Sequence, residues 1–231
     1  LLIALAHVPA SAQYPLVTAC LAAADRLLDP ARAMWEEPRC RRDLEELAGC
    51  LALTALRPSG RQGKVRRRFL SAVTPEGLSF CTETAAAVCG RVYVLEDSYG
   101  LAPALLQRVL EQALQLGQTC LVCYTPLQPD GAPAHLLVPG AGAAFVASSP
   151  DFPYAGERCC TLELDGTLPP AARDTLHFAR DTAGTLLRKA AEHVREAKRI
   201  HDELEALCRP YVDFAAADAL TERTLHELFP A

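Results

Sequence analysis

The feature that most constrains the fold is a strand-helix-strand pattern in the middle of the chain. Arg91–Leu95 is a short apolar, β-branched and aromatic run typical of a buried strand, and Thr119–Thr125 is another. Residues 103–116 between them have helical periodicity, and Gly117 fits the position after a helix end. This spacing predicts a βαβ unit, whose parallel strands are joined by a right-handed crossover. Because both strands are apolar throughout, we expect helices on both faces of the sheet.

The rest of the chain adds elements around this unit. Helices are predicted at residues 16–37, interrupted near Asp29-Pro30, and at 41–56, and further strands at 136–138, 143–147 and, at an edge, 161–164. A long helix at 170–207 has an apolar stripe, and we expect a final helix at 216–228 to pair with it as an antiparallel hairpin. A layer packed on the sheet is the alternative for the long helix. The predicted class is α/β, with a mostly parallel sheet flanked by helices and helical extensions at both ends.

Proline, glycine and charge coincide at residues 57–63, which is the strongest linker signal in the chain. We therefore predict four parts: a helical tail of a preceding, truncated domain (1–57), a linker (58–63), an α/β domain (64–170) and a helical extension (171–231). The apolar start without methionine favours truncation over a signal peptide, because no positively charged segment precedes it.

Charge and hydropathy exclude some classes of partner. A net charge of −5 argues against general affinity for nucleic acid, which clustered Lys and Arg provide. The one basic cluster, residues 61–68, is interpreted as a solvated linker, with a phosphate or acidic-partner contact as the alternative. No run approaches the ~18 apolar residues of a spanning helix, so no membrane anchor is expected.

Ten cysteines are more than average for this length, but they do not form a recognisable site. Cys120 and Cys123 form a C-x-x-C within a predicted strand, where residues three apart point to opposite faces. We interpret the cysteines as buried free thiols, which suits a reducing cytoplasm. His193 and His201 lie too far apart on one helix to bind one metal, and a packing or solvated role is expected.

The turn after the strand at 91–95 has the outline of a phosphate-binding loop without its chemical groups. A strand, a tight loop and a helix are the context in which G-x-x-x-x-G-K-[ST] holds a triphosphate. In a gapless alignment, Asp97 takes the first glycine and Ala102 the second. Pro103 takes the lysine and Ala104 the hydroxyl residue. The groups that would contact the phosphates and the magnesium ion are therefore missing, and Asp97 would repel a polyphosphate. An ordinary strand-to-helix connection is the alternative interpretation.

Four parts of the chain, in order between residues 60 and 220, match the motifs of one protein family. Residues 63–77 are similar to the pattern G-K-x-R-x-x-F-x-S-A-x-T-P-x-G, and residues 91–106 coincide with the P-loop of the family. Residues 136–146 are similar to a strand of the form V-I-P-E-L-G-V-A-I-F, and residues 197–205 and 212–214 to a terminal helical segment. Together these segments resemble a bacterial family of tandem P-loop ATPases, whose members have two nucleotide-binding-like halves, each followed by a helical extension.

The resemblance implies ATP and magnesium as ligands of the family, but a degenerate second half in this chain. Gly100 alone falls on a loop glycine, and a simple turn explains it equally well. Ala147 stands where an acidic or small polar residue would lie near the metal. We therefore expect no catalytic or metal-binding residue, no ligand bound by this portion, and a structural or regulatory role against the preceding half.

Two other function classes stay open at this point. One is a non-enzymatic interaction module that uses the 171–208 helix as a partner surface. The other is a thiol-based enzyme, which would need an accessible cysteine of lowered pKa beside a histidine.

Overall fold

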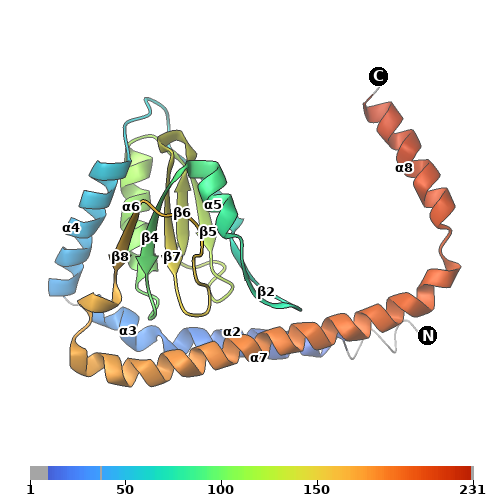
Figure 1. Ribbon diagram of the computed structural model, residues 1–231, viewed down its shortest axis with the longest axis horizontal. Helices are drawn as coiled ribbons and strands as arrows, with labels where there is room; N and C mark the ends of the chain where they lie inside the picture. Colours follow the sequence, from blue (N-terminus) through green and yellow to red (C-terminus); the bar gives the residue numbers. More distant parts are fainter. Residues whose placement is uncertain (1–9, 37, 230–231) are drawn as a thin grey trace.

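The computed structural model describes residues 10–36 and 38–229 (Figure 1). Six strands form the central sheet: β1 (Lys64–Phe69), β4 (Arg91–Glu96), β5 (Thr119–Tyr124), β6 (His135–Val138), β7 (Ala143–Ser148) and β8 (Cys160–Glu163). They lie in the order β1-β5-β6-β7-β4-β8. Only β6 is antiparallel to its neighbours, and the other pairs are parallel. The α/β class and the mostly parallel sheet are therefore confirmed, as is the edge strand near residues 161–164.

Helices cover both faces of the sheet, as the apolar strands indicate. α4 (Pro38–Ala55) and α6 (Ala102–Gln115) pack on one face, and α5 (Thr82–Cys89) packs on the other. Alternate side chains of the central strands enter the two cores, so that Phe145 faces the α4/α6 side and Val146 the α5 side. A two-stranded hairpin, β2 (Ser71–Thr74) and β3 (Gly77–Phe80), precedes α5.

A pair of helices crosses the carboxyl edge of the sheet (Figure 1). α2 (Gln13–Leu27), continued by the short α3 (Asp29–Met34), lies along α7 (Pro170–Cys208), and the break falls at Asp29-Pro30 as predicted. Ala24 of α2 and Leu187 of α7 are buried together in their own apolar cluster. The apolar stripe of α7 therefore packs against α2 over its buried portion.

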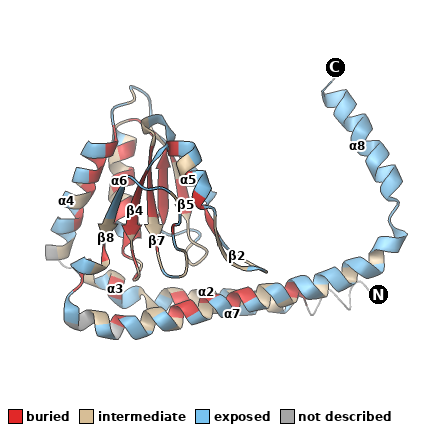
Figure 2. Ribbon diagram, viewed as in Figure 1, coloured by how far each residue is buried: buried red, intermediate tan, exposed pale blue. Residues whose placement is uncertain are grey.

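The predicted antiparallel hairpin between α7 and the helix that follows it, α8 (Phe214–Leu228), is not formed, so this prediction is wrong. A short 3-10 turn at Arg209–Tyr211 and an extended Val212 direct the chain away from α7, and every described residue from 209 to 229 is exposed (Figure 2). Two neighbouring amphipathic helices in sequence therefore do not pair, because the apolar face of α7 already has α2 as its partner. Among the described residues, no helix is long and apolar enough to cross a membrane.

The basic cluster is not a linker along its whole length. Residues 64–69 form strand β1 at one edge of the sheet, although all six are exposed. The segment before it is also fixed: the Ser59 N–H donates to the Leu116 carbonyl at 2.9 Å, and the Gln118 side chain donates to the Arg57 carbonyl at 2.6 Å. α4 joins the main core through α6, whereas the predicted boundary at 58–63 between separate domains stays a prediction.

Candidate functional site

The turn after β4 is closed by its own carboxylate. Asp97 Oδ1 accepts hydrogen bonds from the backbone N–H groups of Tyr99 at 3.2 Å and Leu101 at 2.9 Å, and Oδ2 accepts from Ala102 at 2.7 Å. Ala102 begins α6, whose N-cap residue provides no side-chain hydrogen bond. The carboxylate of Asp97 therefore caps this helix and lies against its positive end, where P-loop proteins place a phosphate.

A second carboxylate binds the same loop from outside. Asp165 Oδ1 accepts from the Ser98 N–H at 2.9 Å, so four consecutive or nearly consecutive backbone donors point at carboxylates. Burial raises the pKa of Asp97, the three backbone hydrogen bonds oppose that rise, and the charge of Asp165 adds to it. The pKa of Asp97 therefore lies above its ordinary value because of burial, while the three backbone hydrogen bonds favour the anion.

The two residues that align with the lysine and the hydroxyl residue of the P-loop pattern lie in the first turn of α6. Pro103 has no N–H to donate and no cation, and Ala104 has no hydroxyl for a metal ion. The residues present therefore do not fit a magnesium-bound triphosphate: the loop donors have a carboxylate partner, and the lysine and hydroxyl are absent. Ala147, at the end of β7 beside this loop, likewise supplies no metal ligand.

Gly100 is at the turn of this loop with φ +76°, a conformation that side chains rarely adopt. A Cβ there would lie 3.4 Å from Nε of Arg32, a residue of α3 that lies over the loop. Arg32 is held by Asp25 at 2.7 Å and Asp29 at 3.1 Å, while its buried Nε has no hydrogen-bond partner. The turn therefore favours glycine at position 100, whereas the Arg32 guanidinium would only touch a Cβ there at an ordinary contact distance.

A small, mostly apolar cavity lies beside the loop, at the carboxyl edge of the sheet. Its volume is about 100 Å³, and Leu28, Ala183 and Leu187 of the crossing helical segment close it. Pockets for drug-sized ligands typically measure about 300–1,000 Å³. A nucleotide therefore has no room in this cavity with the helices in this arrangement.

His135 lines the cavity from the start of β6. Burial lowers the pKa of this imidazole to about 3, so the ring is neutral at ordinary pH. The ring stacks on Phe80 with 4.9 Å between centroids, and its buried Nδ1 has no hydrogen-bond partner. An uncharged, stacked histidine of this kind fills space and contributes no cation for a phosphate.

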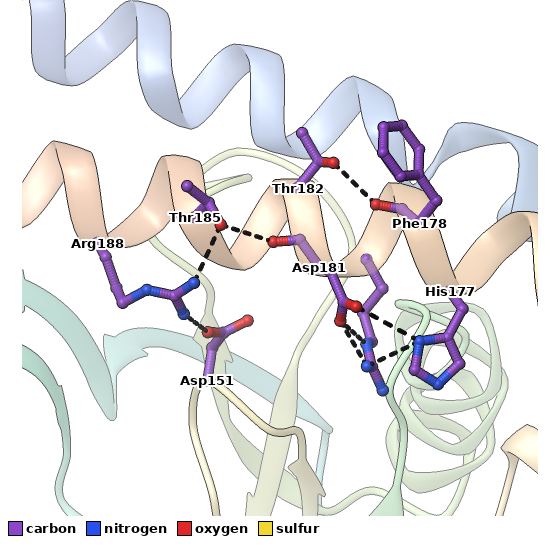
Figure 3. A network of polar contacts seen from close by, with 8 residues as sticks. Asp151, His177, Phe178, Asp181, Thr182, Thr185 and Arg188 are labelled. Atoms are coloured by element: carbon purple, nitrogen blue, oxygen red, sulfur yellow. Dashed lines mark hydrogen bonds and ion pairs between the residues drawn. The ribbon is translucent and has the colours of Figure 1, made fainter.

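Polar contacts join the loop after β7 to α7 (Figure 3), and Asp151 of that loop lines the cavity. Asp151 accepts from Arg188 at 3.4 Å, and a Cβ on Gly184 would lie 2.8 Å from both carboxylate oxygens of Asp151. Burial raises the pKa of Asp151, and the nearby charges of Arg188 and Arg180 lower it. The loop after β7 therefore contacts α7 where that helix has no side chain, which brings the helix close to the sheet edge.

Arg32, His135 and Asp151 were not predicted as members of this site. They come from α3, from β6 and from the loop after β7, and each is ordinary in its own local sequence. Only the fold brings them to the loop at Asp97, so no motif spacing indicates them.

The predicted behaviour of the cysteines is confirmed for some and wrong for others. Cys120 and Cys123 belong to cores on opposite faces of the sheet, and burial raises the pKa of each thiol to about 12. Not all cysteines are buried, however, because four are exposed: Cys50, Cys81, Cys159 and Cys160. His193 packs between helices as expected, with Nδ1 2.9 Å from Gln13 Oε1, and His201 is exposed.

Comparisons with protein-family models, with curated proteins and with solved structures find no match to this chain. Within residues 10–36 and 38–229, no group of three or more His, Cys, Asp or Glu side chains is arranged to hold a metal ion.

Proposed function

We propose that this chain is a P-loop-like domain whose nucleotide site is degenerate, and that its role is structural or regulatory rather than hydrolytic. The single observation that supports this proposal is the internal ligand of the loop. Asp97 accepts the three N–H groups that a P-loop would direct at a phosphate. A bound polyphosphate would have to displace this carboxylate and would meet its negative charge.

The family resemblance gives this role its context. A degenerate half in a tandem protein packs against an active half and completes or adjusts the active site across the interface. The preceding half would then contain the intact lysine and hydroxyl that Pro103 and Ala104 replace here.

Calorimetric titration of Mg-ATP into the chain tests the proposal. We expect no binding heat that depends on the loop of Asp97, and no phosphate release. A matched variant, Asp97→Gly with Pro103→Lys and Ala104→Ser, removes the internal carboxylate and adds the lysine and the hydroxyl of the P-loop pattern. Weak Mg-ATP binding by this variant would show that these three positions account for the absence of binding in the unaltered chain. Micromolar binding of Mg-ATP by the unaltered chain, abolished when the loop alone is mutated, would contradict the proposal.

A second candidate function is an interaction module, as the exposed C-terminal helices favour. The segment 209–229 contributes no buried residue and exposes several large apolar side chains: Tyr211, Val212, Phe214, Leu220, Leu225, Leu228 and Phe229. Exposed apolar residues on one segment are typical of surfaces that bind partners. Pull-down of partners with the full chain but not with a chain ending at residue 208 would favour this function.

A further inference from the structure

A basic cleft lies at the amino edge of the sheet, at the opposite end from the loop of Asp97. The linker before β1, the start of β5 and the turn after β6 surround it, and its volume is about 660 Å³. Arg57, Arg61 and Arg66 line it, and none of the described residues that line it is acidic. The volume is in the range of about 300–1,000 Å³ that small-molecule sites occupy.

The side chains of β1 divide between two faces of the sheet. Arg66 is in register with Leu121, which also lines the cleft, so the two lie on the same face. Arg67 points to the other face, where it pairs with Asp130 at 2.8 Å and stacks over Tyr124 at 4.5 Å. Two neighbouring arginines of one strand therefore differ in that Arg67 has a counter-charge and Arg66 faces the cleft.

The cationic groups of the cleft have no anionic partner within the described chain. Arg57 donates to the carbonyl oxygens of Leu53 and Leu56, and no salt bridge reaches Arg57, Arg61 or Arg66 among the described residues. Like charges that share a cleft repel one another, and a bound anion would relieve that repulsion. Guanidinium groups are suited to phosphate because their planar donors bind two of its oxygens at once.

The backbone that presents these arginines is firmly placed. Ser59 Oγ donates to the Gly117 carbonyl, and the Lys64 N–H donates to the Gln118 carbonyl at 3.3 Å. A Cβ on Gly63 would lie 2.6 Å from the carbonyl oxygen of Leu114, so the linker touches the end of α6. Arg57 and Arg61 therefore line the cleft from a backbone that is already ordered, which lowers the entropic cost of binding a ligand.

We infer that this cleft binds a small molecule bearing two or more linked phosphate groups through Arg57, Arg61 and Arg66. Three guanidinium groups match a ligand with several negative charges better than a single carboxylate. The site is separate from the degenerate loop and does not depend on the proposed function of that loop.

Calorimetric titration of inorganic pyrophosphate into the full chain at low salt tests this inference. We expect saturable binding at one site, and a loss of about tenfold in affinity for Arg66→Gln and for Arg61→Gln, because each removes a charge-assisted pair. Arg67→Gln is the matched control: it removes the same charge one residue away, on the opposite face, and should leave the affinity unchanged. Inorganic orthophosphate should bind more weakly than pyrophosphate.

Absence of pyrophosphate binding to the unaltered chain would overturn the inference. So would an equal loss of affinity in Arg67→Gln and Arg66→Gln, because binding would then depend on overall charge. The same variants separate this site from the degenerate loop: Mg-ATP heat that Arg66→Gln abolishes arises at the cleft, whereas heat that Arg66→Gln leaves intact arises elsewhere. Failure of the cleft to bind pyrophosphate leaves the proposal for the loop unaffected.

Discussion

At the scale of single residues, the Asp97 carboxylate binds the backbone N–H groups that could otherwise bind an external anion. The N-terminus of a helix after a parallel strand favours negative charge, whether that charge belongs to a ligand or to the protein. The Asp97 carboxylate supplies the charge from within the chain, with three backbone hydrogen bonds of 2.7–3.2 Å. Asp97 thus occupies the place that a bound anion takes at other helix ends of this kind.

The lowered pKa of His135 should make the stability of the fold depend on pH, and a variant at this position can separate its contribution from those of other groups. Its pKa is about 3 in the folded chain, and an exposed histidine in the unfolded chain has a pKa of about 6.5. The unfolded state therefore binds more protons between these values, and stability falls as the pH falls below about 6.5. From pH 7.5 to pH 5, we expect this residue to reduce the free energy of unfolding by about 2 kcal/mol.

Urea denaturation of the chain and of His135→Leu at both pH values measures this effect. Other groups that titrate contribute to both proteins, so the difference between the two pH dependences reports on His135. The leucine variant should lose about 2 kcal/mol less than the unaltered chain between pH 7.5 and pH 5. Equal losses would mean that the imidazole is solvated, and the stacked, buried environment beside Phe80 would then be wrong.

At the scale of elements, two glycines that follow or lie within helices should respond oppositely to alanine. Gly117 ends the α6 region with φ +74°, and a Cβ there would lie 2.0 Å from the carbonyl oxygen of Arg61. Gly117→Ala must strain the backbone and displace the linker, so we expect it to destabilise the fold by at least about 2 kcal/mol. Gly49 lies within α4, where a Cβ meets nothing within 4 Å. Gly49→Ala should stabilise the fold by about 0.5–1 kcal/mol.

Chemical denaturation of the two variants checks this contrast. A neutral or stabilising Gly117→Ala would show that the linker is not packed on the end of α6. The backbone that carries Arg57 and Arg61 beside the basic cleft would then not be held in place. The pair controls for the general effect of adding one methyl group to a helix or its end.

Local pattern was sufficient for the buried strands and for the edge strand β8, but not for the edge strand β1. β4 and β7 are apolar because both of their faces are covered, so composition alone indicates them. β1 consists largely of arginine and lysine because an edge strand can expose its side chains, and charge on edge strands also discourages pairing between molecules. Its sequence therefore has the composition of a linker while its backbone pairs in register with β5.

The site was less predictable than the fold, because its parts come from distant segments. In the gapless alignment Pro103 and Ala104 fall on the lysine and hydroxyl positions of the P-loop pattern, and the structure places both in the first turn of α6. The sequence does not indicate that Asp97 folds back onto its own loop, because that depends on the exact turn from Ser98 to Leu101. The position of Arg32 over Gly100 depends on how α3 packs, which no local pattern specifies.

At the scale of the whole molecule, helices that are distant in sequence pack together at one edge of the sheet. α2 and α7 are far apart in sequence, yet they pack along each other and close the carboxyl edge. The loop of Asp97 and the cavity beside it are consequently covered by the segment of α2 and α3 and by α7. Any regulation that acts on these helices would also change access to the cavity beside Asp97.

The buried contacts of α7 end well before its last turn, which predicts that the C-terminus can be removed without loss of stability. Ala197 is the last described residue that is buried, and the 3-10 turn and α8 that follow are exposed throughout. A chain that ends at Cys208 loses no residue of the buried core, so its thermal midpoint should stay within about 2 °C of that of the full chain. Differential scanning calorimetry at two protein concentrations measures both midpoints. A midpoint that drops by more than this at either concentration would mean that α8 packs in solution. If the drop also grows with concentration, α8 packs between copies of the chain, since only association depends on concentration.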